Sequence, residues 1–83
     1  MTRDEILARV AEAMHELFDV DPTRVRPGAR LREDLDLDSL DAVDLAARLQ
    51  SLTGRRIADG DLRRMKTVGD ILDLVARDLS TSR

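Results

Sequence analysis

The chain has 83 residues, of which 42% are hydrophobic and 37% charged, and its net charge is −3, a balance typical of one small globular domain. It has no cysteine, one histidine and one aromatic residue, which excludes disulfides, thiolate or multi-histidine metal sites and base-stacking platforms for nucleic acid. No apolar run approaches a membrane span, and the first ten residues lack the apolar core of a signal peptide. We therefore expect a soluble, cytoplasmic protein that binds no nucleic acid.

The charges are segregated along the chain. Residues 33–44 contain six acidic residues and no basic one, whereas residues 48–66 contain six basic residues and two acidic ones. An acidic segment followed by a basic one indicates oriented recognition of protein partners, because charge steers the approach of a partner and sets its register. The alternative is that both segments are ordinary solvated surface.

The first half of the chain predicts one helix and one long loop. Residues 4–18 carry apolar side chains at spacings of three and four, and Thr2 with Glu5 forms a capping-box pattern at the start. Residues 19–38 form the loop, because Pro22 and the pair at 27–28, Pro-Gly, interrupt helices. Its spaced apolar residues would attach it to a core, and a loop this long in a small domain indicates a function.

The second predicted helix covers residues 39–52, with Asp38 or Ser39 as its N-cap and Gly54 at its end. It has two apolar stripes. The first is assigned to the core and comprises Ala42, Leu45, Ala46, Leu49 and Leu52; the second comprises Leu40, Val43 and Ala47. A helix with a second apolar stripe often binds a partner, although in a small protein both stripes can simply be buried.

The last third predicts a short helix over residues 59–65, capped by Asp59 or Asp61, and a final helix over 67–79 opened by a capping box of Thr67 and Asp70. Residues 80–83 are expected to be a frayed tail. The chain as a whole therefore predicts a single domain over residues 1–83, an all-α bundle of three main helices and one short helix.

Residues 34–41, Asp-Leu-Asp-Leu-Asp-Ser-Leu-Asp, carry the chemistry, and two interpretations of them fail. The carboxylates at 34, 36 and 38 match the first ligands of a calcium loop, but Ser39 replaces the turn glycine and Leu45 replaces the bidentate glutamate. Weak binding of a divalent cation is all that the acidic residues predict, and no metal site is assigned. A nucleophilic Ser39 lacks the usual elbow sequence, and His15, in the middle of the first helix, is the one imidazole in the chain.

The third interpretation makes Ser39 the acceptor of a covalent group. Its hydroxyl would lie at a helix N-terminus, where free N–H groups and the helix dipole favour a phosphodiester. The surrounding carboxylates would then serve recognition by a basic partner enzyme. The alternative is that Asp38 and Ser39 only cap the helix.

At these residues the chain resembles the acyl carrier protein family. Residues 38–45, DSLDAVDL, closely resemble the phosphopantetheine attachment motif of that family. The preceding RPGARLREDL resembles the loop that leads to the attachment site, and DGDLRRM with KTVGDILDLV resembles the third and fourth helices. The resemblance covers residues of about 4–79 in order, which is nearly the whole chain.

The resemblance implies a four-helix carrier domain that is not itself an enzyme. A phosphopantetheinyl transferase would attach 4′-phosphopantetheine from coenzyme A to Ser39, and the thiol of that arm would carry acyl groups between acyl-loading, condensing and other biosynthetic enzymes. Asp38 would orient the serine and the transferase. The resemblance further implies an apolar docking stripe of Leu40, Val43 and Ala47, steering charges at Asp36, Asp41 and Asp44, and core or chain-lining positions at Leu45, Leu49, Ile57, Leu62, Val68, Ile71 and Leu72. Transient docking fits a monomer.

The chain departs from the usual fatty-acid carriers in three places. Asp36 replaces a common glycine, Thr53 stands where a bulky apolar residue often closes the helix, and the stretch 48–66 is basic rather than acidic. Our hypothesis is therefore a carrier for a specialised pathway, such as polyketide, aryl polyene or lipid modification chemistry, rather than the housekeeping fatty-acid carrier. A peptidyl or aminoacyl carrier and a non-covalent helical adaptor are the alternatives.

Overall fold

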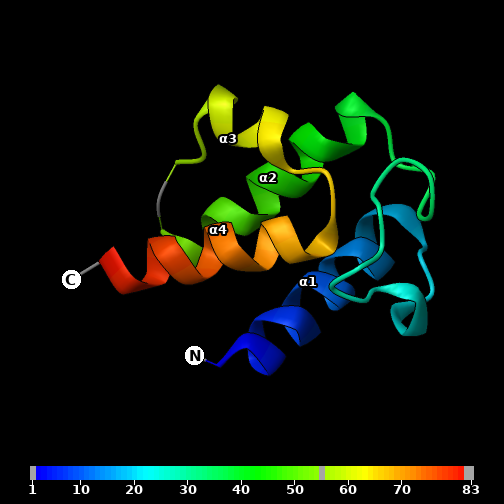
Figure 1. Cartoon of the computed structure of the whole chain (residues 1–83), viewed down its shortest axis with the longest axis horizontal. Helices are drawn as coiled ribbons and strands as arrows, with labels where there is room; N and C mark the ends of the chain where they lie inside the picture. Colours follow the sequence, from blue (N-terminus) through cyan, green and yellow to red (C-terminus); the bar gives the residue numbers. More distant parts are fainter. Residues whose placement is uncertain (1, 55, 82–83) are drawn as a thin grey trace.

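The computed structural model describes residues 2–54 and 56–81, and it contains four α-helices and one short 3₁₀ turn (Figure 1). The elements are α1 (Arg3–Phe18), η1 (Pro22–Arg24), α2 (Ser39–Thr53), α3 (Asp59–Arg64) and α4 (Val68–Thr81). The predicted fold class is confirmed, with three long helices, one short helix and a long connection between α1 and α2. None of the helices in the described part is long and apolar enough to cross a membrane.

Local sequence sets most of the helix boundaries. The Thr2 hydroxyl accepts from the Glu5 N–H at 3.2 Å and the Glu5 carboxylate accepts from the Thr2 N–H, so the predicted capping box starts α1. Helix α2 ends at Gly54, whose φ of 72° is the left-handed conformation of a helix C-cap.

Three local predictions are wrong: a loop without helical turns, an aspartate cap for α3, and a tail that frays from residue 80. Loop 19–38 contains η1, because Pro22 occupies the first position of the turn, where a missing N–H is harmless, and the Asp21 carboxylate accepts from Thr23 N–H. Helix α3 has Ala58 as its N-cap and no side-chain cap hydrogen bond, so neither Asp59 nor Asp61 caps it. Helix α4 continues to Thr81 instead of fraying after 79, and residues 82–83 of the predicted tail lie outside the described part.

The core lies where α1 packs against α2 and α4, and α3 packs against α2 (Figure 1). Some predicted core positions are only half-buried, because they lie near helix ends or beside a groove: Ala42, Leu52 and Leu62. The side chains that are essentially inaccessible are Ile6, Val10, Met14, Leu45, Leu49, Val68, Ile71, Leu72 and Val75.

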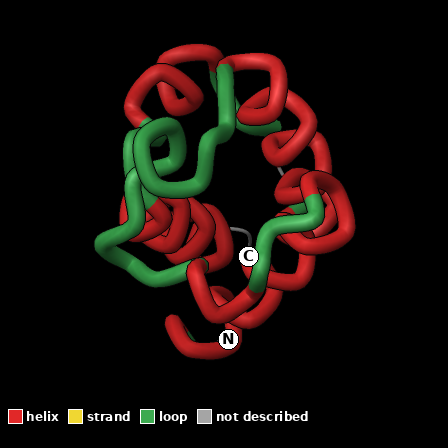
Figure 2. The backbone as a smooth tube through the Cα atoms, turned by 90° about the vertical axis from the view of Figure 1, so that its right-hand side faces the viewer, coloured by secondary structure: helices red, strands yellow, loops and turns green. Residues whose placement is uncertain are grey.

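Loop 19–38 is attached to the core by both side chains and backbone. Its five spaced apolar residues, Val20, Val25, Leu31, Leu35 and Leu37, are all buried. Its backbone also pairs with the segment that leads into α4: Leu31 N–H donates to Lys66 O at 2.9 Å, Val68 N–H to Ala29 O at 2.9 Å, and Gly69 N–H to Pro27 O at 2.8 Å. Figure 2, which views this end of the molecule, shows the loop segments around the helix ends. The loop is therefore a fixed part of the fold.

Helix α3 is held to α4 by an ion pair. Arg77 Nη2 lies 3.1 Å from Asp61 Oδ2 and 3.1 Å from Asp78 Oδ1. The hydrogen bond from Arg77 holds the pKa of the Asp61 carboxyl below its ordinary value of 3.8. This short helix is thus tied to α4 on one side while it packs on α2 on the other.

Candidate functional site at the start of helix α2

Helix α2 begins with a reciprocal cap made by two aspartates. Asp38 Oδ1 accepts from Asp41 N–H at 2.9 Å, and Asp41 Oδ2 accepts from Asp38 N–H at 3.1 Å. Asp38, rather than Ser39, is therefore the N-cap. Two carboxylates predicted to contact partners thus already have a local role, which is to fix the position of the first turn.

Ser39 occupies the first position of α2 and is exposed. No hydrogen bond of its hydroxyl is found among residues 2–54 and 56–81, and the N–H groups of Ser39 and Leu40 have no partner there. Figure 1 shows this turn at the far end of the molecule from the first turn of α1 and the last turn of α4. The result is an accessible hydroxyl beside unpaired helix N–H groups, which are suited to a phosphate ester.

The geometry offers no base for a nucleophilic Ser39. His15 is on α1, where its Nδ1 atom lies 3.2 Å from the Val20 carbonyl oxygen, and it does not line the groove beside Ser39. No group of three or more potential metal ligands is found in the described part of the chain. The described residues around Ser39 thus contain neither the imidazole nor the metal-ligand group that would activate its hydroxyl.

The second stripe of α2 faces solvent. Leu40 is 74% exposed and Val43 is 54% exposed, and Ala47 is exposed next to them. Of the predicted steering charges, Asp36 and Asp44 have no ion pair or side-chain hydrogen bond within the described residues, unlike Asp41. The sequence left open whether both stripes of α2 are buried, and the structure answers that only the first is.

Asp36 adopts a left-handed backbone conformation, with φ at 58°. A residue with a Cβ is strained there, although aspartate tolerates it better than most. This conformation gives a physical reason for the glycine that the resemblance leads one to expect at this position. It also turns the chain immediately before the cap of α2.

A groove of about 750 Å³ opens beside Ser39, between the long loop, the first turns of α2, and α3 with the segment that follows it. Leu31, Leu37, Leu45 and Met65 are its buried apolar lining residues. Half-buried Leu62 faces it, which explains why that side chain is not in the core. The charged or polar residues around it are Arg30, Arg32, Glu33, Asp38, Ser39, Arg63, Lys66 and Thr67.

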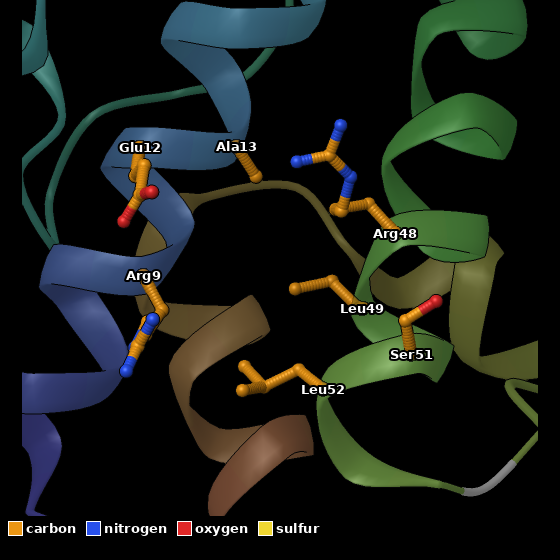
Figure 3. Close-up of a pocket in the computed structure, with 7 residues that line it drawn as sticks. All are labelled: Arg9, Glu12, Ala13, Arg48, Leu49, Ser51 and Leu52. Atoms are coloured by element: carbon orange, nitrogen blue, oxygen red, sulfur yellow. The ribbon is translucent and has the colours of Figure 1, made fainter.

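The basic stretch 48–66 does not form one patch. Arg48 points toward α1 in the groove of Figure 3, where its Nη1 lies 2.7 Å from Glu16 Oε2 and holds the pKa of Glu16 below its ordinary value of 4.5. Arg63 and Lys66 border the groove beside Ser39, whereas Arg64 borders another depression with Arg77. Arg55 lies outside the described residues. These cations thus serve separate surfaces.

The chain is similar to known carrier proteins. Residues 8–75 match the family described as a phosphopantetheine attachment site. Acyl carrier protein 2 of Ralstonia nicotianae is 52% identical over 75 residues, which cover 90% of this chain and 93% of that protein. The meromycolate extension acyl carrier protein of Mycobacterium leprae is 34% identical over 77 residues, covering 93% and 67%.

The fold agrees as well. A crystal structure of an acyl carrier protein from Thermotoga maritima superposes with a TM-score of 0.88 at 26% identity, covering 98% of this chain and 94% of that one. The family match and this structural likeness identify the class of the protein as a phosphopantetheine-binding carrier domain. The chain belongs to the acyl carrier protein family, and it functions as an acyl carrier.

Sequence reasoning missed two residues at this site. Arg30 and Arg32 come from the loop and border the groove beside Ser39, yet the basic stretch was taken to begin only at residue 48. They flank buried Leu31 immediately before the acidic segment.

Proposed function

We propose that Ser39 carries 4′-phosphopantetheine and that the chain transports acyl groups as thioesters on this arm. The observation that carries the proposal is the exposed Ser39 hydroxyl, without a hydrogen-bond partner in the described residues, at a capped helix start inside the matched region. The first turn of α2 can accept the charge of the phosphodiester at its free N–H groups. The arm would supply the thiol, which suits a chain that has no cysteine.

The attachment is a phosphoryl-group transfer catalysed by a phosphopantetheinyl transferase. The Ser39 oxygen forms a bond to the phosphorus next to pantetheine in coenzyme A, the bond to the second phosphate breaks, and adenosine 3′,5′-bisphosphate leaves with the serine proton passing to a base on the transferase. This chain supplies the hydroxyl and its position. On this proposal it is a carrier and not an enzyme.

Partner enzymes would dock on the exposed stripe of α2. Leu40, Val43 and Ala47 offer a small apolar surface, and Asp44 and Asp36 remain available to steer a basic partner, whereas Asp38 and Asp41 present their carboxylates from the cap. A small apolar surface surrounded by steering charge favours rapid, reversible docking. The transferase and the acyl-loading and condensing enzymes would share this surface, with the chain acting as a monomer in the cytoplasm.

The pathway is proposed to be a specialised one rather than housekeeping fatty-acid synthesis. The arginines that border the groove beside Ser39 support this, because they alter the surface that an acyl substrate and a partner would meet. The relative named for meromycolate extension is consistent with carriers of this fold being used by dedicated chain-extending systems. Elongation by housekeeping fatty-acid enzymes as efficient as on their own carrier would overturn this part of the proposal.

The test is intact mass before and after incubation with coenzyme A and a broad-specificity transferase. The wild-type chain should gain one phosphopantetheine, and Ser39→Ala should gain none while keeping its unfolding midpoint. Ser51→Ala is the matched control, since Ser51 is also exposed on α2 but lines the groove of Figure 3 instead. It should be modified like wild type.

The alternative function is a helical adaptor that binds partners through the α2 stripe without a covalent group. The exposure of Leu40 favours it as the second candidate. An adaptor would keep partner binding in Ser39→Ala and gain no mass in wild type, so the same experiment separates the two. A peptidyl or aminoacyl carrier would gain the arm but would be loaded by an amino-acid-activating enzyme.

A further inference from the structure

The groove beside Ser39 has cations that the fold does not use. Arg30 lies 3.4 Å from Asp34 and 3.6 Å from Glu33, so it is paired within the loop. Arg32, Arg63 and the Lys66 ammonium, by contrast, have no ion pair or side-chain hydrogen bond within residues 2–54 and 56–81. All three are exposed and come from two segments far apart in sequence, the long loop and the region of α3.

The negative groups of the same groove do not balance these cations. Asp38 and Glu33 are the two carboxylates of the lining, against the four cations Arg30, Arg32, Arg63 and Lys66, and Glu33 faces Arg30. The groove therefore combines an apolar interior with an unneutralised positive border. The helix N-terminus at Ser39 adds to the same positive potential.

We propose that this groove binds acyl chains that carry a carboxylate remote from the thioester, and that Arg32, Arg63 and Lys66 bind that carboxylate. The inference rests on the proposed attachment at Ser39, which places the tethered substrate at the edge of the groove. Half-buried Ala42 and Leu62 and exposed Val43 line the groove, and they contact the aliphatic part of the chain. Specificity then comes from charge complementarity at the border and from burial of methylene groups inside.

The size of the groove favours an amphipathic occupant. A volume of about 750 Å³ lies in the range of pockets that bury whole small molecules, and it greatly exceeds what a phosphate group fills. Each buried methylene group strengthens binding by about fourfold, which gives the apolar interior a role that a phosphodiester does not use. A purely aliphatic chain, in turn, leaves three cations without a partner.

The test compares two acyl chains of equal length on the same protein. The transferase loads octanoyl-4′-phosphopantetheine or suberoyl-4′-phosphopantetheine from the corresponding coenzyme A thioesters, and loading at Ser39 is verified by intact mass. The cleavage rate of each thioester by hydroxylamine is then measured and divided by the rate of the free pantetheine thioester. Binding in the groove shields the thioester, so we expect the carboxylate-terminated form to be cleaved about threefold to tenfold more slowly than the methyl-terminated form.

Two triple variants identify the cause. In Arg32→Gln/Arg63→Gln/Lys66→Gln the two loaded forms should be cleaved at equal rates. The matched control is Arg9→Gln/Arg56→Gln/Arg64→Gln, which removes the same charge from exposed positions that do not line this groove, and it should keep the wild-type difference. High salt should reduce the difference, because exposed ion pairs are screened.

The other outcomes overturn the proposal in distinguishable ways. Equal rates for both acyl forms in the wild type would reject the carboxylate-binding groove while leaving attachment at Ser39 intact. Slower cleavage of the octanoyl form would identify a neutral chain as the occupant. An equal change of both forms in the first triple variant would assign the cations to the phosphodiester. Failure to load Ser39 would reject the carrier proposal as well.

Discussion

The first turn of α2 is open to solvent, whereas loop 27–31 covers the first turn of α4. Both helices begin with the same local device: Asp38 and Asp41 cap each other at α2, and Thr67 and Asp70 do so at α4, with Asp70 N–H donating to Thr67 Oγ1 at 3.2 Å. At α4 the carbonyl oxygens of Ala29 and Pro27 in the loop also accept hydrogen bonds from the N–H groups of Val68 and Gly69.

The difference shows how one local motif acquires two uses. Where a neighbouring backbone satisfies the free N–H groups, the helix start becomes part of the core and tolerates little change. Where the N–H groups remain free, the turn can accept an anionic group without disturbing the fold. The covered start supports the loop that carries Arg30, Arg32 and the approach to Ser39, so the two starts depend on each other.

The largest expected effect on stability comes from comparing two leucine-to-alanine substitutions, one on α4 and one on α2. Leu72 on α4 is 1% exposed, so Leu72→Ala should lower the free energy of unfolding by about 2–5 kcal/mol through loss of burial and a cavity. Leu40→Ala on α2 should change it by less than about 0.5 kcal/mol, because Leu40 is 74% exposed, while slowing modification by the transferase. Chemical denaturation measures both, and equal losses would contradict the comparison.

The second prediction concerns the close contact between the loop and α4. A Cβ on Gly69 would lie 3.0 Å from Pro27 O, which already accepts the Gly69 N–H. Gly69→Ala should therefore destabilise the chain by about 1–2 kcal/mol. Gly60→Ala on α3 is the control, since its Cβ would meet nothing within 4 Å, and it should raise stability by up to about 1 kcal/mol through helix propensity. If Gly69→Ala raised the stability instead, the loop at Pro27 would be able to move away from the new Cβ at little cost, which would contradict the prediction.

The third prediction tests strain in the approach to α2. Because Asp36 has φ at 58°, Asp36→Gly should relieve the left-handed conformation and raise stability by less than about 1 kcal/mol, net of the added entropy of the unfolded chain. Asp19→Gly at the end of α1, with φ at 59°, should behave alike without altering docking. Thermal unfolding of both variants is the measurement, and a loss in both would contradict the strain argument.

The smallest expected effect on stability comes from lowering the pH. Hydrogen bonds from the Arg30 N–H and guanidinium hold the pKa of Asp34 below its ordinary value of 3.8. A lowered folded-state pKa means that the stabilisation is complete above pH 3.8 and is lost as the pH falls through the folded-state value. Asp34→Asn should therefore lower the urea midpoint at pH 6 and flatten its fall below pH 3.8. An unchanged pH profile in the variant would remove Asp34 from the support of the loop.

The elements themselves could be read from residues 2–81 because their signals are local. The capping boxes, the spacing of apolar side chains and Gly54 act within a few residues of each other, and they correctly predicted four helices. They also indicated the second stripe of α2, but only the packing decided that Leu40 and Val43 are exposed. The missed turn η1 and the uncapped start of α3 involve three to six residues, where such signals are weak.

The sequence by itself therefore determined the family, the helices and the serine at the start of α2, since each depends on neighbouring residues or on a contiguous motif. Only the tertiary structure decided which helix start stays open and which is covered, because the backbone pairs of residues 27–31 with 66–69 join distant segments. It also decided that Arg32, Arg63 and Lys66 border the same groove beside Ser39 while Arg48 pairs with Glu16. Periodicity and composition carry no information on contacts between distant segments, which follow from how the whole chain packs.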